Sequence, residues 1–366
     1  MNYTLSKYEC TALRGFAIIG IFLHNYIHWL GPMVKENEYM YRQYNVDRML
    51  SVLSHPSWDL PLQLFSFFGH YGVPVFLFLS GFGLVKKYES PSAALRPEGM
   101  GSILWSRYMK LFPMMFLGFA LFTMVDWITP GHHHWTWTDV VAQLTMTINL
   151  LPNPDKIIWP GPYWFFGLMM QLYAIYVFVI YRRSNAWVIG LIALSLFLQL
   201  LCIGNPEGDT INRLRYNSIG GLLPFGMGVL LGRTAPSTKT PATEQQNGSQ
   251  QLKYAMAFLG SVAAVFAFSL PAGCGNWASY CFWLMVPFFI VTLHMAMVKI
   301  LPAILIKGLV WVGGLSSAIF VCHPIPRKIF VSISRGGDIP GGLVLYIVAT
   351  ILLAMFFKKI LSSRNN

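Results

Sequence analysis

The chain has 366 residues, of which 55% are hydrophobic and 11% are charged, and its formal net charge is +12. Soluble domains carry about 25% charged residues, so this composition excludes a soluble globular protein and indicates a polytopic integral membrane protein. The basic residues stand at the ends of apolar runs and form no single patch, which argues against nucleic acid as a partner. No segment remains for a second, soluble domain, so we expect one transmembrane domain over residues 1–366.

Apolar runs separated by charged residues, Pro and Gly predict about ten transmembrane helices. An open sheet edge cannot face lipid, so all spans must be helices and the expected fold class is all-α. The long outer loops 31–63 and 129–162 offer room for an acceptor, and the polar stretch 234–251 predicts a flexible cytoplasmic linker. The expected spans are residues 12–30, 64–85, 109–128, 163–181, 186–204, 216–232, 253–271, 278–298, 306–324 and 341–357.

Lys and Arg residues set the expected orientation. With the N-terminus inside, sixteen of them lie in cytoplasmic segments and nine in outer segments, which favours two cytoplasmic termini. The first apolar run has no small-residue cleavage site after it, so it is expected to stay as an anchor. We therefore expect a multi-pass protein of the cell inner membrane whose constant partner is the lipid bilayer.

The first expected span carries three polar side chains. Arg14 lies near the start of LRGFAIIGIFLHNYIHWL, and His24 and His28 lie towards its end. A charged group at the bilayer centre costs about 2.5–3.5 kcal/mol, so an intramembrane arginine indicates a functional site. On an ideal helix His24 lies roughly 80° around and about 15 Å along the axis from Arg14, and His28 follows one turn later. The alternative is that Arg14 snorkels to lipid phosphates and the histidines cap polar neighbours.

Small and basic residues mark the next two runs. Ser80 and Gly81 interrupt the second run, where small residues favour close helix packing. His70, near the outer end of that run, is expected at the membrane interface. Arg107 and Lys110 are three residues apart at the inner start of the third run, so they share one helix face. They are either surface anchors or a clamp for phosphate groups.

Aromatic and histidine residues follow. Trp164 opens the fourth run and suits an aromatic belt. His323, before a proline at the outer end of the ninth run, is either structural or faces the histidines of the first run. The histidine triplet at 132–134 has diverging side chains and no nearby carboxylate, so we expect no metal site there, or elsewhere in the chain. The five cysteines show no metal-ligand spacing.

Five stretches together resemble the integral membrane acyltransferases of the acyltransferase 3 family. The resemblance covers most of the chain and implies a ten-helix core that takes an acyl group, commonly acetyl, from cytosolic acyl-CoA. It implies that the acceptor is a hydroxyl of a cell-surface carbohydrate or a lipid-linked precursor, and that no cofactor is permanently bound. The stretches are LRGFAIIGIFLH, VPVFLFLSGFGL, SRYMKLFP, YWFFGLMMQLY and FVCHP.

The resemblance also implies roles for single residues. A neutral His24 accepts the proton of the acceptor hydroxyl as its oxygen attacks the thioester. Arg14 holds donor phosphates or orients the base, and Arg107 and Lys110 bind the phosphates of CoA. Nine residues lie between Arg14 and His24, where the family usually has ten. Either the helix is locally irregular, therefore, or His28 shares the role of base.

Three alternatives stay open at the level of sequence. Ser80 is a possible covalent acyl relay, ranked below direct transfer because nothing in the sequence places a base beside it. A transporter or flippase of a glycan or lipid intermediate also suits intramembrane charges and broken helices, but it would ignore acetyl-CoA. A non-catalytic assembly partner would tolerate loss of His24 and His28 alike. Acceptor, acyl chain and oligomeric state are left open.

Overall fold

The structure is a computed structural model that describes residues 5–90, 98–235 and 248–362. Every regular element in these ranges is helical, which confirms the all-α fold class. Most of the linker expected at 234–251 lies outside the described residues. Its two ends belong to helices, because Thr234 is the last residue of α12 (Ser218–Thr234) and residue 248 is the first of α13 (Gly248–Ser269).

Seven helical segments of the described chain are long and apolar enough to cross a membrane. Two of them are built from more than one element, because the second span breaks at a 3-10 turn, and the fourth begins with a 3-10 turn and ends in a π-helical turn. The segments are α1 (Lys7–Ile27), α3 (Leu60–Phe68) with η1 (Gly69–Tyr71) and α4 (Gly72–Tyr88), α6 (Met100–Ile128), η3 (Gly161–Tyr163) with α9 (Trp164–Ile175) and η4 (Tyr176–Ile180), α13, α14 (Asn276–Ile300), and α18 (Ile339–Ser362).

The other three expected spans are also helical, but they are shorter or bent. Helix α10 (Asn185–Leu200) has 16 residues and α12 has 17, or about 24–26 Å at 1.5 Å per residue, less than the roughly 30 Å hydrocarbon layer. Helices α15 (Ala303–Gly313) and α16 (Ser316–Cys322) form one candidate span bent by 52°. Seven or eight spans are therefore supported, and the expected count of ten is not confirmed.

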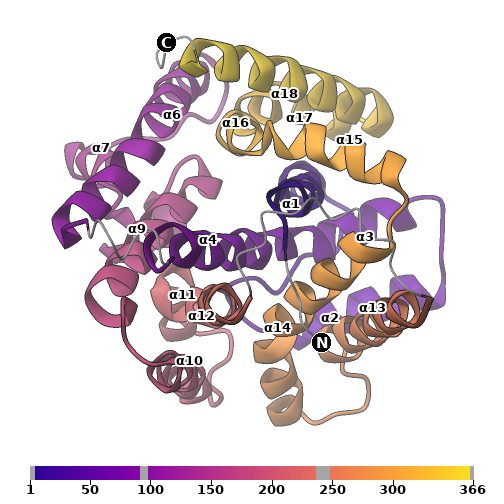
Figure 1. The fold of residues 1–366 in the computed structure, drawn as a ribbon. Coiled ribbons are helices and arrows are strands. Elements are labelled where there is room, and N and C mark those ends of the chain that lie inside the picture. The colour runs from indigo at the N-terminus through magenta and orange to yellow at the C-terminus, as the bar shows by residue number, and fades with distance from the viewer. Residues whose placement is uncertain (1–4, 91–97, 236–247, 363–366) are drawn as a thin grey trace.

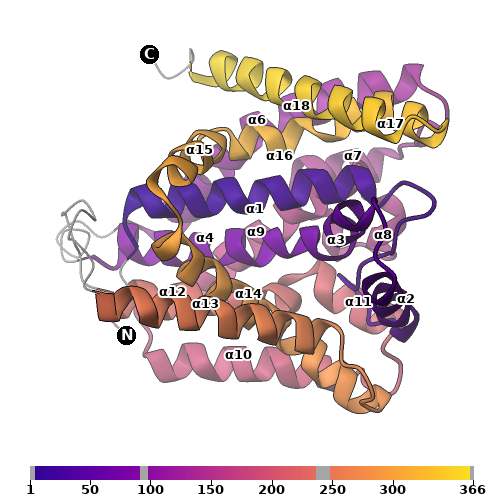
Figure 2. The same ribbon diagram turned by 90° about the vertical axis from the view of Figure 1, so that its right-hand side faces the viewer.

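Short helices gather at one end of the bundle. Figure 2 shows the N-terminal end of α1 and the C-terminal end of α18 at the left, whereas the short helices of the loops lie at the right. Helix α1 thus begins and α18 ends on the same side of the bundle, and the longer loops belong to the other side. The short helices are α2 (Gln43–Ser54), α7 (Trp137–Leu144), η2 (Ile148–Leu150), α8 (Pro154–Ile157), α11 (Asp209–Tyr216) and α17 (Pro324–Arg335).

Helix α1 lies in the middle of the bundle, between α4 and α15 (Figure 1). Glycines let its neighbours approach at backbone distance. A Cβ at Gly313 would lie 1.9 Å from the Thr11 carbonyl oxygen, and one at Gly69 would lie 2.6 Å from both the Gly20 oxygen and the His24 Cβ. The second of these contacts places the 3-10 turn beside His24, and so the packing of the bundle positions the most polar part of α1.

Ion pairs join helices at the end of the bundle where α1 begins. The first turn of α1 has a capping box between Ser6 and Glu9, and Glu9 is 2.5 Å from the Lys299 ammonium at the end of α14. Arg233 at the end of α12 pairs with Glu89 at 2.7 Å. These pairs join helices that are far apart in the sequence.

The contact between α4 and α12 gives a sharp stability test. A Cβ at Gly81 would lie 2.2 Å from the Phe225 carbonyl oxygen, whereas one at Gly83, on the same helix, would meet no atom within 4 Å. We expect Gly81→Ala to lower the free energy of unfolding by about 1–3 kcal/mol through overpacking. Gly83→Ala is the matched control and should change it by less than about 0.5 kcal/mol. Thermal unfolding in detergent measures both, and equal midpoints would contradict the packing described.

Candidate active site

A polar cavity of about 320 Å³ opens at the end of the bundle that holds the short helices. The end of α1 forms one wall, the loop after it forms a second, and the starts of α9 and α17 complete it. Histidines, carboxylates, aromatic rings and one guanidinium therefore face a common space. The lining residues that carry chemistry are His24, His28, Glu36, Glu38, Trp164 and Arg327.

His24 is buried at the inner wall of this cavity. Its Nδ1 lies 2.8 Å from the Ser66 carbonyl oxygen. A carbonyl can only accept a hydrogen bond, so Nδ1 must carry the proton in this arrangement. The neutral ring then has its lone pair on Nε2, the tautomer of a histidine that acts as a base or as a ligand through that atom.

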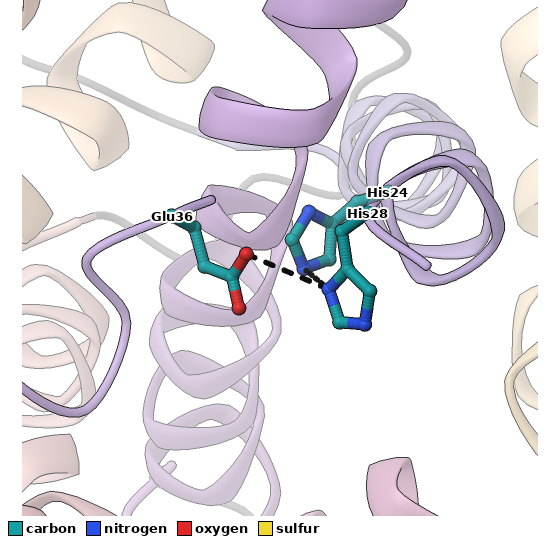
Figure 3. Close-up of side chains that lie close together, drawn as sticks. All are labelled: His24, His28 and Glu36. Atoms are coloured by element: carbon teal, nitrogen blue, oxygen red, sulfur yellow. Dashed lines mark hydrogen bonds and ion pairs between the residues drawn. The ribbon is translucent and has the colours of Figure 1, made fainter. Parts of the chain in front are cut away.

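His28 and Glu36 extend from His24 in a chain of contacts, drawn in Figure 3. The His28 Nδ1 lies 3.2 Å from the His24 Nε2 and 3.5 Å from the Glu36 Oε2. The Nδ1 proton of His28 therefore has two possible acceptors, the lone pair of His24 and the carboxylate. A small rotation of the His28 ring would move this proton from one to the other.

Two glutamates of the loop after α1 differ in charge. Burial alone would raise the pKa of Glu36, but the neighbouring His28 and His24 rings hold it well below its usual value. Burial, together with the charge of Glu36, raises the pKa of Glu38 to about 8. Near neutral pH Glu36 is thus a carboxylate and Glu38 is mostly protonated, a pairing typical of sites that handle protons.

Helix α1 is a continuous α-helix from Lys7 to Ile27, which includes Arg14 and His24, and His28 is its C-cap residue. No local irregularity of the helix therefore compensates for the spacing of nine residues, instead of ten, between Arg14 and His24. Instead His28 lies against His24, with ring centroids 4.6 Å apart. Of the two explanations that the sequence left open, the geometry fits the one in which the two histidines work as a pair.

The structure places two further sequence candidates near this pair. Trp164 is buried and lines the cavity, edge-on to Tyr39 at 5.3 Å. His323 is fully buried and bonds the Ile319 carbonyl oxygen of its own helix, and it lies close enough to His24 to interact electrostatically. Among the described residues its Nε2 has no hydrogen-bond partner. His323 is thus buried close to His24 but does not line the cavity itself.

The structure buries His70 within the bundle. Its side chain is only 5% exposed, and its ring lies 5.6 Å from that of His24. The break at η1 turns His70 towards α1, and helical periodicity alone does not predict such a break. Among the described residues, neither ring nitrogen has a hydrogen bond of ordinary geometry, and the ring lines the same cavity.

The basic candidates form a second group, around the Tyr88 hydroxyl at the end of α4. The Arg107 Nη2 and Nε donate to the Tyr88 hydroxyl at 2.7 and 3.2 Å, and the Lys87 ammonium lies 3.0 Å from the same oxygen. Arg14, Arg107 and Lys87 all interact electrostatically with Lys110. This gathering of like charges, with Arg14 and Lys110 exposed, is suited to binding a polyanion.

Ser80 is not among the residues that line the cavity with the histidines and carboxylates. The interaction found for its hydroxyl is a hydrogen bond with the Tyr173 side chain, and tyrosine is a weak base at neutral pH. Gly81 beside it fits the packing role expected for this stretch, through its backbone contact with α12. The surroundings of Ser80 therefore give no support to a covalent relay.

Sequence reasoning missed Glu36, Glu38 and Arg327. The loop that carries the glutamates has no motif, and Arg327 comes from a helix about 300 residues later. One signal was present: the chain has only 14 acidic residues, and Glu36 follows His28 by eight positions. Acidic residues are rare in this chain, so one that lies so close in sequence to His28 was the signal that could have identified Glu36 as a candidate.

Comparison with known proteins gives one family. A family model described as an acyltransferase domain matches residues 8–359, and this range contains both groups of candidate residues. No curated protein and no solved structure gives a significant match.

Proposed function

Because the chain belongs to the acyltransferase 3 family and has membrane-spanning helices, we propose that it is an acyl-CoA-dependent O-acyltransferase. It moves an acyl group, with acetyl as the first to test, from cytosolic acyl-CoA to a hydroxyl of an extracytoplasmic or lipid-linked carbohydrate. The observation that carries this proposal is the position of the His24 lone pair, fixed on Nε2 by the Ser66 carbonyl and directed to a polar cavity.

In this proposal His24 is the general base. Its Nε2 takes the proton of the acceptor hydroxyl while the hydroxyl oxygen attacks the thioester carbonyl carbon. The new C–O bond forms, the C–S bond breaks, and the proton passes from His24 to the departing thiolate of CoA. Transfer is direct, with no acyl-enzyme on Ser80.

His28 and Glu36 support the base. When the Nδ1 proton of His28 turns to the Glu36 carboxylate, the His24 lone pair is free to receive the acceptor hydroxyl. Glu36 is thus a positioning residue that acts through His28. This arrangement explains why two histidines, one turn apart, stand beside a single ionised carboxylate.

The donor enters from the inner end. Arg107 and Lys110 bind the phosphates of CoA, and Arg14 holds the donor or orients it towards His24. Arg14 and His24 are about 15 Å apart along the helix axis, a gap for the pantetheine arm to cross. Placing the thioester inside the membrane protects it from hydrolysis by bulk water.

The acceptor occupies the outer cavity. Trp159, Trp164 and Tyr39 present aromatic rings to it, and Asp155 presents a carboxylate. Aromatic faces with a few polar groups suit a sugar, which has apolar ring faces and many hydroxyls. We place both termini in the cytoplasm of a cell bounded by an inner membrane, in line with the distribution of Lys and Arg.

Glu36→Gln tests the role of the carboxylate. The substitution keeps the size of the side chain but removes its charge, so the His28 proton stays on the His24 lone pair. We expect kcat for acyl transfer to fall about 10-fold, with KM for the donor unchanged. Glu36→Asp, which keeps the charge, should recover part of the rate. Equal losses in both variants would contradict a role for the charge.

Incorporation of labelled acetyl from acetyl-CoA into glycolipids of the native membrane tests the function itself. The acceptor should gain one acetyl group for each CoA thiol released.

A further inference from the structure

Three possible metal ligands meet at the mouth of the candidate active site. The His24 Nε2, the His28 Nδ1 and a Glu36 carboxylate oxygen all lie within 4.8 Å of one another. Figure 3 shows the three side chains pointing toward one another. The sequence alone predicts no metal site, because the carboxylate belongs to a loop and reaches the histidines only through the fold. Two histidines and one carboxylate form a ligand set that Zn²⁺ uses in proteins.

The distances between these atoms suit a tetrahedral ion. Two ligand atoms at about 2.0–2.1 Å from a tetrahedral Zn²⁺ lie about 3.3–3.4 Å apart. Here the two imidazole nitrogens are 3.2 Å apart, and the His28 nitrogen and the Glu36 oxygen are 3.5 Å apart. Only the distance between the His24 nitrogen and the Glu36 oxygen has to become shorter, through a movement of the Glu36 side chain.

The surroundings of the cluster fit a metal ligand set. The His24 Nδ1 donates to the Ser66 carbonyl oxygen at 2.8 Å, and metal-binding histidines characteristically donate their other N–H to a carbonyl or carboxylate. The Glu36 Oε2 is buried, and its contact with His28 is longer than an ordinary hydrogen bond.

A second observation points to a ligand in the same place. His70 is 95% buried and lines the cavity, and within the described part of the chain neither of its ring nitrogens has a hydrogen bond of ordinary geometry. The side chains of His28 and Glu36 are 20% and 15% exposed, so an ion can enter from the cavity mouth. The structure therefore provides ligands, an open coordination position and a path.

We propose that His24, His28 and Glu36 form a site for a divalent transition-metal ion, with Zn²⁺ as the fitting member, loaded from the outer side of the membrane. Binding uses the lone pair of His24, so the ion and the acceptor hydroxyl compete for the same atom. Zinc should therefore act as a reversible inhibitor of acyl transfer. The site itself is independent of the proposed function, whereas the inhibition rests on it.

The test uses purified full-length chain in detergent, freed of its affinity tag and treated with EDTA. His132 and His134, whose rings lie 5.1 Å apart in an outer loop, are replaced by alanine in every protein tested, since they could bind zinc on their own. Calorimetric titration with ZnCl₂ gives stoichiometry and affinity, and visible absorption of bound Co²⁺ reports tetrahedral geometry. Thermal unfolding checks the folding of each variant.

We expect one zinc ion per chain, bound at least about tenfold more weakly after Glu36→Gln or His28→Ala. His55→Ala, which removes an exposed histidine directly after α2, should leave the affinity unchanged. Absence of zinc binding, or affinities within about twofold of the parent in both folded variants, would overturn the site. The two proposals fail separately: zinc binding without acyl transfer refutes the function, and transfer without zinc binding refutes the site.

Discussion

Replacing His24 by alanine is expected to lower kcat for acyl transfer by about 10²- to 10⁴-fold, the usual contribution of a general base. The reason is geometric, because the Ser66 carbonyl fixes the proton on Nδ1 and leaves Nε2 to accept one. His28→Ala removes a partner of the base but not the base, so its loss should be about 10-fold. Initial rates of CoA thiol release in proteoliposomes measure both.

The control for this prediction is His55→Ala, because His55 is an exposed residue directly after α2 and does not line the candidate cavity. Its rate should match that of the wild type. Two results would contradict the assignment of the base: a larger loss for His28→Ala than for His24→Ala, or a loss for His24→Ala that is explained by a lower yield of folded protein.

Arg107→Ala is expected to raise KM for acetyl-CoA by about 10- to 100-fold with little change in kcat. A hydrogen bond to a charged group contributes about 1.5–3 kcal/mol, and each 1.4 kcal/mol is tenfold in affinity. The Tyr88 hydroxyl occupies two nitrogens of the Arg107 guanidinium, and the group has five N–H donors in all. Donors are therefore left for a phosphate, on a side chain that Tyr88 already holds in place.

A truncated donor sharpens this prediction. Acetyl-pantetheine has the same thioester but lacks the nucleotide phosphates, so Arg107→Ala should leave its rate constants unchanged. Arg183→Ala, which removes an exposed arginine beyond η4, is the matched control for lost positive charge. An equal fall in rate with both donors would show that Arg107 supports the fold or the chemistry instead of the phosphates.

Much of the fold follows from the sequence, because composition and apolar runs dominate a membrane protein. Each of the ten expected runs overlaps a helix. The reason is that a single segment in lipid has to satisfy its backbone hydrogen bonds internally, as an α-helix does. The number of spans does not follow. The 52° bend between α15 and α16 and the short α10 depend on how neighbouring helices pack, and hydropathy carries no information about packing.

The candidate site was predictable only in part. The polar residues of α1 stand out in the sequence, since Arg14, His24 and His28 interrupt an apolar run. Their partners do not stand out, because Glu36 comes from a loop and His70 depends on a 3-10 turn held by close backbone contact at Gly69. Periodicity describes residues within one element, whereas this cavity is lined by several helices and by the loop after α1.

Transfer of radiolabelled acetyl from acetyl-CoA to glycolipids, in membranes that contain the native acceptors, tests the central claim most directly. The proposed function predicts label in the glycolipid fraction with the wild type and loss of that label with His24→Ala. If the folded wild-type protein leaves the acceptor without label, over a broad set of acyl-CoA donors, the claim is contradicted. Movement of an unmodified glycolipid across the bilayer would then favour a transporter.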